Sequence, residues 1–325
     1  MEYRSDDLMA LCIAVAQKHG ASLETAVSLA SGTIHAETSG RPTLGIIHFF
    51  DYLDALREGR LKGAARPIIT RPTRATIVAD GDGGIPHVAF DRVFEDLVDS
   101  AHEFGVSIFS QRNAYTCGAL GYFVERLAIE GLVSIAGANS SALMAAGGAS
   151  DRAVFGTNPL AFAAPRSSGR PLVIDQASSQ TALVNVREAA RNATAIPVGW
   201  AVDRVGSPTI DAEAALTGAL LPFGGYKGAN IALMVEILAA ISGGNWSLDA
   251  WPFDSGDRNP AVGMFLVSID PVLFDPNFST RLERHLARLR VDYRMHIPGD
   301  SRASGPATTC EVPTEVFTRL QQLSF

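Results

Sequence analysis

Cysteine is scarce in this sequence of 325 residues, and its three copies lie far apart. Cys12, Cys117 and Cys310 form no CxxC pair, so the sequence offers neither a thiolate zinc site nor a disulfide framework. An odd number of widely separated cysteines is typical of proteins from a reducing compartment. We therefore expect a protein with no metal centre.

Long apolar runs are absent as well, although 47% of the residues are hydrophobic. Glycine or a charged residue interrupts each apolar stretch well before the roughly 20 residues that a membrane-spanning helix needs. Residues 1–20 predict an amphipathic helix with Asp6 and Asp7 in its first turn, whereas a secretory signal begins with cationic residues. The sequence therefore predicts a cytoplasmic protein with no membrane partner.

Positive charge is also in short supply. The sequence has 27 Lys and Arg residues against 34 Asp and Glu residues, and its net charge is −7. A nucleic-acid surface would need clustered Lys and Arg, whereas the basic run from Arg57 to Arg74 is spread out by Pro and Gly. The composition therefore predicts no nucleic-acid partner.

The elements that are present change in character along the chain. Apolar residues at helical spacing predict helices over 5–19, from an N-cap at Ser22 to about Glu37, and over 45–59. Beyond residue 75, short apolar strands alternate with helices, which favours an α/β sheet covered on both faces. The G-x-G-x-x-G fingerprint of a Rossmann site is missing, because the nearest cluster, GDGGIP, has a Pro where the helix should start. The residues alone thus indicate a large α/β enzyme without that fingerprint.

Several longer segments, in the same order, resemble the malate/L-lactate dehydrogenase family, which includes ureidoglycolate dehydrogenase, diketogulonate reductase and cyclic ketimine reductases. They are GALGYFVERLAIEGLVSIAGANS, FGTNPLAFAAPR, PLVIDQASS, ALTGALLPFGGYKG, GMFLVSIDP and HIPGD, and they extend over residues 30–300. The resemblance implies a non-Rossmann α/β fold, an NAD or NADP cofactor, and a homodimer. It further implies a cofactor-binding domain over 76–275, with the helical segment 1–75 packing on 276–325 as a substrate and dimerisation lobe.

The resemblance also implies a set of cofactor-binding positions. A lysine that begins a helix is suited to a phosphate group, and serine and aspartate oxygens are suited to the hydroxyl and phosphate groups of a dinucleotide. The implied residues are Asn139, Ser140, Thr157, Asn158, Asp175, Gln176, Ala177, Ser178, Ser179, Lys227, Pro298, Gly299 and Asp300.

Three of these residues also have a purely structural interpretation. Lys227 resembles a solvated helix start, Asn158 a turn residue that bonds its own backbone, and Asp175 a helix N-cap. One departure from the family concerns charge, because residues 183–185 read Leu-Val-Asn where members often carry Arg-Gly-Lys. NAD and NADP therefore remain alternatives.

The proton-transfer positions depart further from the family. Hydride transfer to a carbonyl needs a proton donor, and the family takes it from a Ser-His-Gly-x-x-Arg-x-x-x-Tyr motif that corresponds here to residues 43–52. Thr43 keeps a hydroxyl and Tyr52 keeps the phenol, but Leu44 replaces the catalytic histidine and His48 replaces the arginine. A second family histidine falls on Thr116, and a third has become tyrosine in the Gly-Tyr-Lys turn that ends at Lys227.

Three interpretations of these replacements stay open. In the first, the substrate carries a C=N bond that arrives already protonated. In the second, the acid has moved to His48 or, as lesser candidates, to Tyr52 or Tyr115. In the third, the scaffold serves a non-redox reaction or ligand binding. The structural alternative for His48 is a partly buried side chain that is hydrogen-bonded only to the backbone. We expect an NAD(P)-dependent oxidoreductase that reduces a C=O or C=N bond next to the carboxylate of a small molecule, with Thr43, His48, Tyr52 and Thr116 as catalytic candidates.

Overall fold

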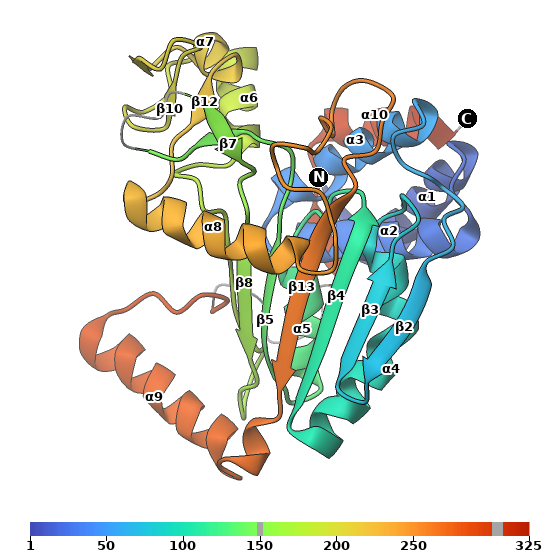
Figure 1. The fold of residues 1–325 in the computed structure, drawn as a ribbon, viewed down its shortest axis with the longest axis vertical. Coiled ribbons are helices and arrows are strands. Elements are labelled where there is room, and N and C mark those ends of the chain that lie inside the picture. Colours follow the sequence, from blue (N-terminus) through green and yellow to red (C-terminus); the bar gives the residue numbers. More distant parts are fainter. Residues whose placement is uncertain (148–151, 301–307, 325) are drawn as a thin grey trace.

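A seven-stranded mixed sheet runs through the centre of the molecule (Figure 1). The computed structural model describes residues 1–147, 152–300 and 308–324. The β3–β4 pair is parallel, and the other neighbouring pairs are antiparallel. In spatial order the strands are β2 (Ile68–Thr73), β3 (Thr76–Asp80), β4 (Val106–Ala114), β13 (Val262–Ile269), β5 (Val133–Ala138), β8 (Leu160–Ala164) and β9 (Leu172–Gln176).

Helices α4 (Pro86–Phe104) and α5 (Gly121–Ile129) cover one face of this sheet. Their apolar sides meet the strands in a core where Phe90, Phe109 and Phe123 are fully buried, and the Phe90 and Phe123 rings pack edge to face at 5.0 Å. Helix α8 (Tyr226–Ala240) lies across the other face, against β13 and β5. The predicted α/β fold with a sheet covered on both faces is confirmed.

The N-terminal helices form a second layer beside the sheet. Helices α1 (Ser5–Lys18), α2 (Leu23–Thr38) and α3 (Ile46–Arg57) match the three predicted helices, and the Oγ of Ser22 accepts from the Thr25 N–H at 3.2 Å, as expected of an N-cap. Between α2 and α3 the chain makes one short 3₁₀ turn, η1 (Pro42–Leu44).

The C-terminal segment returns to these helices. Strand β1 (Glu2–Arg4) pairs with β14 (Thr309–Glu311), and helix α10 (Thr314–Ser324) packs on α1. Helix α9 (Phe278–Tyr293), preceded by the turn η2 (Pro271–Leu273), instead reaches the opposite end of the sheet, where Leu286 packs with Ala164 and Leu172. The division of the chain at residues 75 and 275 stays a prediction.

A small second sheet sits above α8 in Figure 1. Its strands are only two or three residues long, and α6 (Leu183–Arg191) and α7 (Ala212–Leu216) pack on it around Met144, Val186 and Leu220. In spatial order the strands are β11 (Pro208–Thr209), β10 (Ala201–Val202), β12 (Ala219–Leu220), β6 (Met144–Ala145) and β7 (Ala153–Phe155). Within the described residues, no helix is long and apolar enough to cross a membrane.

Candidate active site

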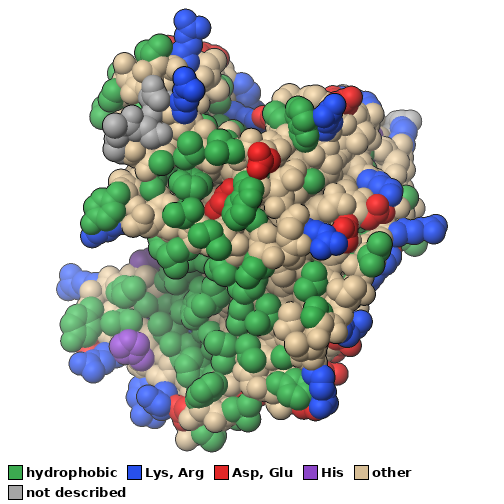
Figure 2. Space-filling model, in the orientation of Figure 1, with side chains coloured by type: hydrophobic (Ala, Val, Ile, Leu, Met, Phe, Trp, Pro, Cys, Tyr) green, Lys and Arg blue, Asp and Glu red, His purple; other side chains and the backbone are tan. Residues whose placement is uncertain are grey.

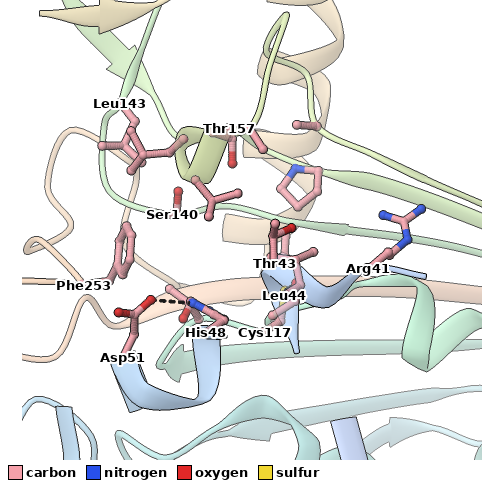
Figure 3. Close-up of a pocket in the computed structure, with 18 of the residues that line it drawn as sticks. Arg41, Thr43, Leu44, His48, Asp51, Cys117, Ser140, Leu143, Thr157 and Phe253 are labelled. Carbon is pink, nitrogen blue, oxygen red and sulfur yellow. Dashed lines mark hydrogen bonds and ion pairs between the residues drawn. The ribbon is translucent and has the colours of Figure 1, made fainter. Parts of the chain in front are cut away.

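A cavity of about 320 Å³ opens where the N-terminal helices, the end of the main sheet and helix α6 meet (Figure 3). One wall is formed by η1 and the first turns of α3, and the opposite wall by α6 and the chain after β5. Its lining comes from residues 41–51, 116–118, 138–143, 157–159, 175–177 and 182–191, together with Phe253. Six segments and Phe253, spread from residue 41 to residue 253, thus face one space.

The structure brings most of the expected residues to this cavity. Tyr52 lies directly behind its wall, while Asn158, Ser178, Ser179, Lys227 and residues 298–300 do not line it. The expected residues that do line it are Thr43, His48, Thr116, Asn139, Ser140, Thr157, Asp175, Gln176 and Ala177.

His48 is held by a carboxylate that the sequence analysis did not single out. Its Nδ1 lies 2.8 Å from Oδ2 of Asp51, one helical turn later on α3, and its ring packs edge-on against Tyr52 (Figure 3). Burial would raise the pKa of Asp51, but the hydrogen bond and the positive charges around it keep that pKa below its ordinary value. Among the described residues, Nε2 of His48 has no hydrogen-bond partner. The Asp51 carboxylate therefore orients the imidazole and leaves its other nitrogen available.

Thr116 offers a hydroxyl to the cavity. Its Oγ1 is buried and has no partner within the part of the chain that the structure describes. A buried hydroxyl left unpaired costs about 1–3 kcal/mol, so this oxygen is suited to a ligand. The Tyr52 phenol donates to the carbonyl oxygen of Thr116 at 3.0 Å, and burial raises the Tyr52 pKa well above its ordinary value. Tyr52 thus positions Thr116 and is poorly suited to protonate a substrate.

Glu37 fixes the start of the helix that carries His48. Its Oε1 accepts from the Ile46 N–H at 2.6 Å, and a Cβ on Gly45 would come within 2.4 Å of the same oxygen. A side chain at position 45 would therefore force Glu37 to move. Burial raises the pKa of Glu37 from its ordinary 4.5 to about 6, and the hydrogen bond from Ile46 opposes part of that shift.

Asp175 makes the contacts that join the sheet to both neighbouring layers. Its side chain is only 5% exposed; Oδ2 accepts from the Gly121 N–H at 2.9 Å and lies 3.2 Å from Nη1 of Arg41. Nη2 of Arg41 also donates to the backbone oxygen of Asp175 at 2.6 Å. Sequence reasoning missed Arg41, because 134 residues separate it from its partner.

Positive charge also reaches the cavity from helix α6. Leu183 and Val184 bring no charge to the lining, but Arg187 and Arg191 line the same wall one and two turns later. Arg187 pairs with Asp254 and lies over the Phe253 ring at 5.6 Å, whereas Arg191 is exposed. Two arginines therefore line the cavity on the helix whose first residues, 183–185, carry no charge.

Cys117 lines the cavity but is unsuited to act as a nucleophile. Burial raises the pKa of its thiol to about 12, and the negative charge of Asp175 adds to the shift. A thiol with that pKa stays protonated near neutral pH.

Several expected cofactor residues make structural contacts. Asn158 donates to Oε2 of Glu236 at 2.7 Å, the Ser178 hydroxyl donates to the Asn158 carbonyl at 2.7 Å, and Ser179 donates to the Thr181 carbonyl at 2.6 Å. Lys227 is exposed in the first turn of α8.

The Pro-Gly-acid turn lies beyond the far end of β9. A Cβ on Gly299 would sit 3.6 Å from the Pro171 oxygen, and Asp300 pairs with Arg166 at 2.9 Å and Arg290 at 2.6 Å. Cofactor binding by these residues and by Lys227 stays a prediction.

Comparison with known proteins gives consistent results. The model of the malate/L-lactate dehydrogenase family matches residues 3–309. A Delta(1)-pyrroline-2-carboxylate/Delta(1)-piperideine-2-carboxylate reductase of Pseudomonas syringae pv. tomato is 36% identical, covering 94% of this chain and 91% of the relative. A (2R)-3-sulfolactate dehydrogenase (NADP(+)) of Chromohalobacter salexigens is 33% identical over 90% of this chain and 88% of its own. The solved delta1-piperideine-2-carboxylate reductase of P. syringae superposes with a TM-score of 0.93, at 34% identity and 99% coverage of both chains.

The raised pKa of Glu37 predicts how stability depends on pH. Between pH 4.5 and 6 the folded chain binds more protons than the unfolded chain, so the free energy of unfolding falls as the pH rises. Glu37→Gln keeps an oxygen for Ile46 but does not titrate. We expect denaturant melts to show the variant gaining up to about 2 kcal/mol on the wild type between pH 4.5 and 7. The exposed Glu213→Gln should show no such trend, and a pH-independent difference for Glu37→Gln would contradict the assignment.

Proposed function

This chain belongs to the malate/L-lactate dehydrogenase family and is an oxidoreductase, and from that premise we propose that it reduces the C=N bond of a small cyclic imine bearing a carboxylate. The observation that carries this choice is the apolar Leu44 at the family's acid position, in a cavity to which the Thr43 and Thr116 hydroxyls, His48 and Arg41 contribute polar groups. The nitrogen of a cyclic imine is more basic than a ketone oxygen, so a weaker acid is enough to protonate it during reduction.

The cavity has the donor set that a nicotinamide nucleotide requires. Hydroxyl and amide groups of Ser140, Thr157 and Gln176 line it, and Arg187 and Arg191 bring positive charge for phosphate groups. We propose that these residues hold the nucleotide and that NADPH is preferred over NADH, in keeping with the NADP(+) in the sulfolactate dehydrogenase's name. When bound, the reduced nicotinamide ring supplies the hydride.

The residues on the α3 side would handle the substrate. His48, oriented by Asp51, would donate the proton that the product nitrogen retains, and the Thr43 and Thr116 hydroxyls would orient the reacting bond. This arrangement supports the proposed division into a substrate lobe, formed by 1–75 with 276–325, and a cofactor domain over 76–275. The pairing of β1 with β14 joins the two parts of that substrate lobe.

Substrate turnover tests the proposed reaction. The absorbance of NADPH or NADH should fall rapidly with pyrroline-2-carboxylate or piperideine-2-carboxylate, and kcat/KM should be about 100-fold lower with pyruvate or oxaloacetate, which need full protonation by the protein. NADPH should also raise the melting temperature of the protein. Stabilisation by NADPH without turnover of any of these acids would favour a repurposed binding protein, and no stabilisation by either nucleotide would overturn the proposal at its first step.

A matched pair of histidine variants tests the proton donor. His48→Ala should lower kcat for the cyclic imine about 100-fold, with little change in the melting-temperature rise caused by NADPH. His102 supplies the control, because its Nδ1 also lies 2.8 Å from a carboxylate, that of Asp270, but it is remote from the cavity. His102→Ala should retain full activity. Equal kcat values for His48→Ala and the wild type would remove His48 from the mechanism.

We also propose that the chain forms a homodimer through the face that carries α8. Figure 2 shows a broad hydrophobic surface below α8, extending toward α9. From Ile231 to Ala240, helix α8 carries apolar residues on its exposed side as well as toward the sheet, which is typical of a helix that is covered on both sides. A second copy of the chain would cover the exposed apolar residues, which include Ile135, Leu233, Met234, Ile237 and Ile241.

A charge in this face should separate the two copies. Ile237 is 50% exposed on α8, one turn after the exposed Leu233, and Ile237→Arg would place a charge in the proposed contact. We expect sedimentation to give twice the chain mass for the wild type and the chain mass for the variant. Val198→Arg, at an exposed position away from α8, should remain a dimer. A monomeric wild type would contradict the proposal.

A further inference from the structure

We propose that Arg41 binds the carboxylate of the substrate and so replaces the cation that the family carries at position 48. This inference rests on the proposed function, since it names the group that recognises the substrate of the same site. Arg41 immediately precedes η1, which brings Thr43 and Leu44 to the cavity, and its own side chain lines the cavity wall. Figure 3 shows Arg41 and His48 on opposite sides of Thr43 and Leu44.

The Arg41 guanidinium is fixed before a substrate arrives. Nη1 and Nη2 contact the carboxylate and the backbone oxygen of Asp175 at 3.2 and 2.6 Å, and the side chain remains 29% exposed. An arginine has five N–H donors in a rigid plane, and within the described parts of the chain these are its polar contacts. The anchored guanidinium therefore keeps donors for a second carboxylate and loses little side-chain entropy when it binds one.

Asp175 does not cancel the charge that Arg41 offers. Oδ2 of Asp175 also accepts from the N–H of Gly121, the first residue of α5. The N-terminus of a helix carries a partial positive charge, so the carboxylate is compensated from two directions. The group formed by Arg41, Asp175 and the start of α5 is thus positive overall and attracts an anion.

The other cations of the cavity are less suited to this task. Arg187 is paired with Asp254, Arg191 is exposed on the outer turn of α6, and His48 is paired with Asp51. With its carboxylate on Arg41, a cyclic substrate would lay its methylene groups against the apolar side chains of Leu44 and Ile47. This placement gives the leucine at the family's histidine position a role in binding the ring.

Kinetics on a charged and an uncharged substrate test the assignment. Arg41→Met removes the charge, and kcat/KM for pyrroline-2-carboxylate should fall about 10- to 100-fold, mainly through KM. The value for pyrroline itself, which lacks the carboxylate, should stay within about 3-fold of the wild type, because the reducing machinery is intact. A purely structural role for Arg41 would lower both values together.

Two further variants keep the test decisive. Arg112→Met is the control, because Arg112 also contacts a carboxylate, Asp80 at 3.1 Å, and a backbone oxygen, Ser242 at 3.0 Å, away from the cavity. Arg112→Met should leave kcat/KM for both substrates unchanged. If the loss of Asp175's partner prevents Arg41→Met from folding, Arg41→Lys takes its place. Lysine keeps a positive charge but lacks the planar guanidinium group, so KM for pyrroline-2-carboxylate should still rise. An unchanged ratio of the two kcat/KM values in a folded Arg41 variant would overturn the inference, whereas a wild type inactive on both substrates would refute the proposed function instead.

Discussion

The buried carboxylate of Asp175 is the constraint on which the arrangement of the cavity depends. It lies near the end of β9, where it is almost fully removed from water, and an isolated charge there would cost several kcal/mol. The N-terminus of α5 and the guanidinium of Arg41 compensate it. One side chain therefore ties the sheet, a helix that covers it and the segment between α2 and α3 into a single wall. The position of Thr43 and Leu44 follows from that connection.

The second organising feature is the way that polar groups hold the α3 side of the cavity. Glu37 sets the first turn of α3, Asp51 orients His48, and Tyr52 holds the backbone of Thr116. Glu37 and Tyr52 do not line the cavity, so their contacts do not depend on the side chains at positions 44 and 116, where the family's histidines have been replaced. The scaffold that positions a substrate is thus retained, while the groups that would transfer a proton have changed. This combination is suited to a substrate whose nitrogen is easily protonated.

Local patterns predicted much of the fold and less of the cavity. The helices over 5–59 followed from apolar spacing and the Ser22 cap, and the main strands followed from short apolar runs. Both kinds of signal are carried by residues that are close together in the sequence. The small sheet was missed because strands of two or three residues carry no periodic signal. The Asp51–His48 pair lies at helical spacing and was open to prediction, whereas Arg41 and Asp175 meet only through the tertiary fold. Lys227 and Asp300 illustrate the reverse case, since family position alone placed them in a site whose cavity they do not line.

In the arrangement that we propose, the cavity binds a carboxylate with Arg41 and presents the adjacent double bond to His48. A crystal structure with an oxidised nicotinamide nucleotide and pyrrole-2-carboxylate, a planar analogue that resists reduction, tests it most directly. We expect the analogue's carboxylate to lie within about 3 Å of the Arg41 guanidinium, with its ring against Leu44. A carboxylate bound instead to His48 or Arg187, with Arg41 contacting only Asp175, would contradict it.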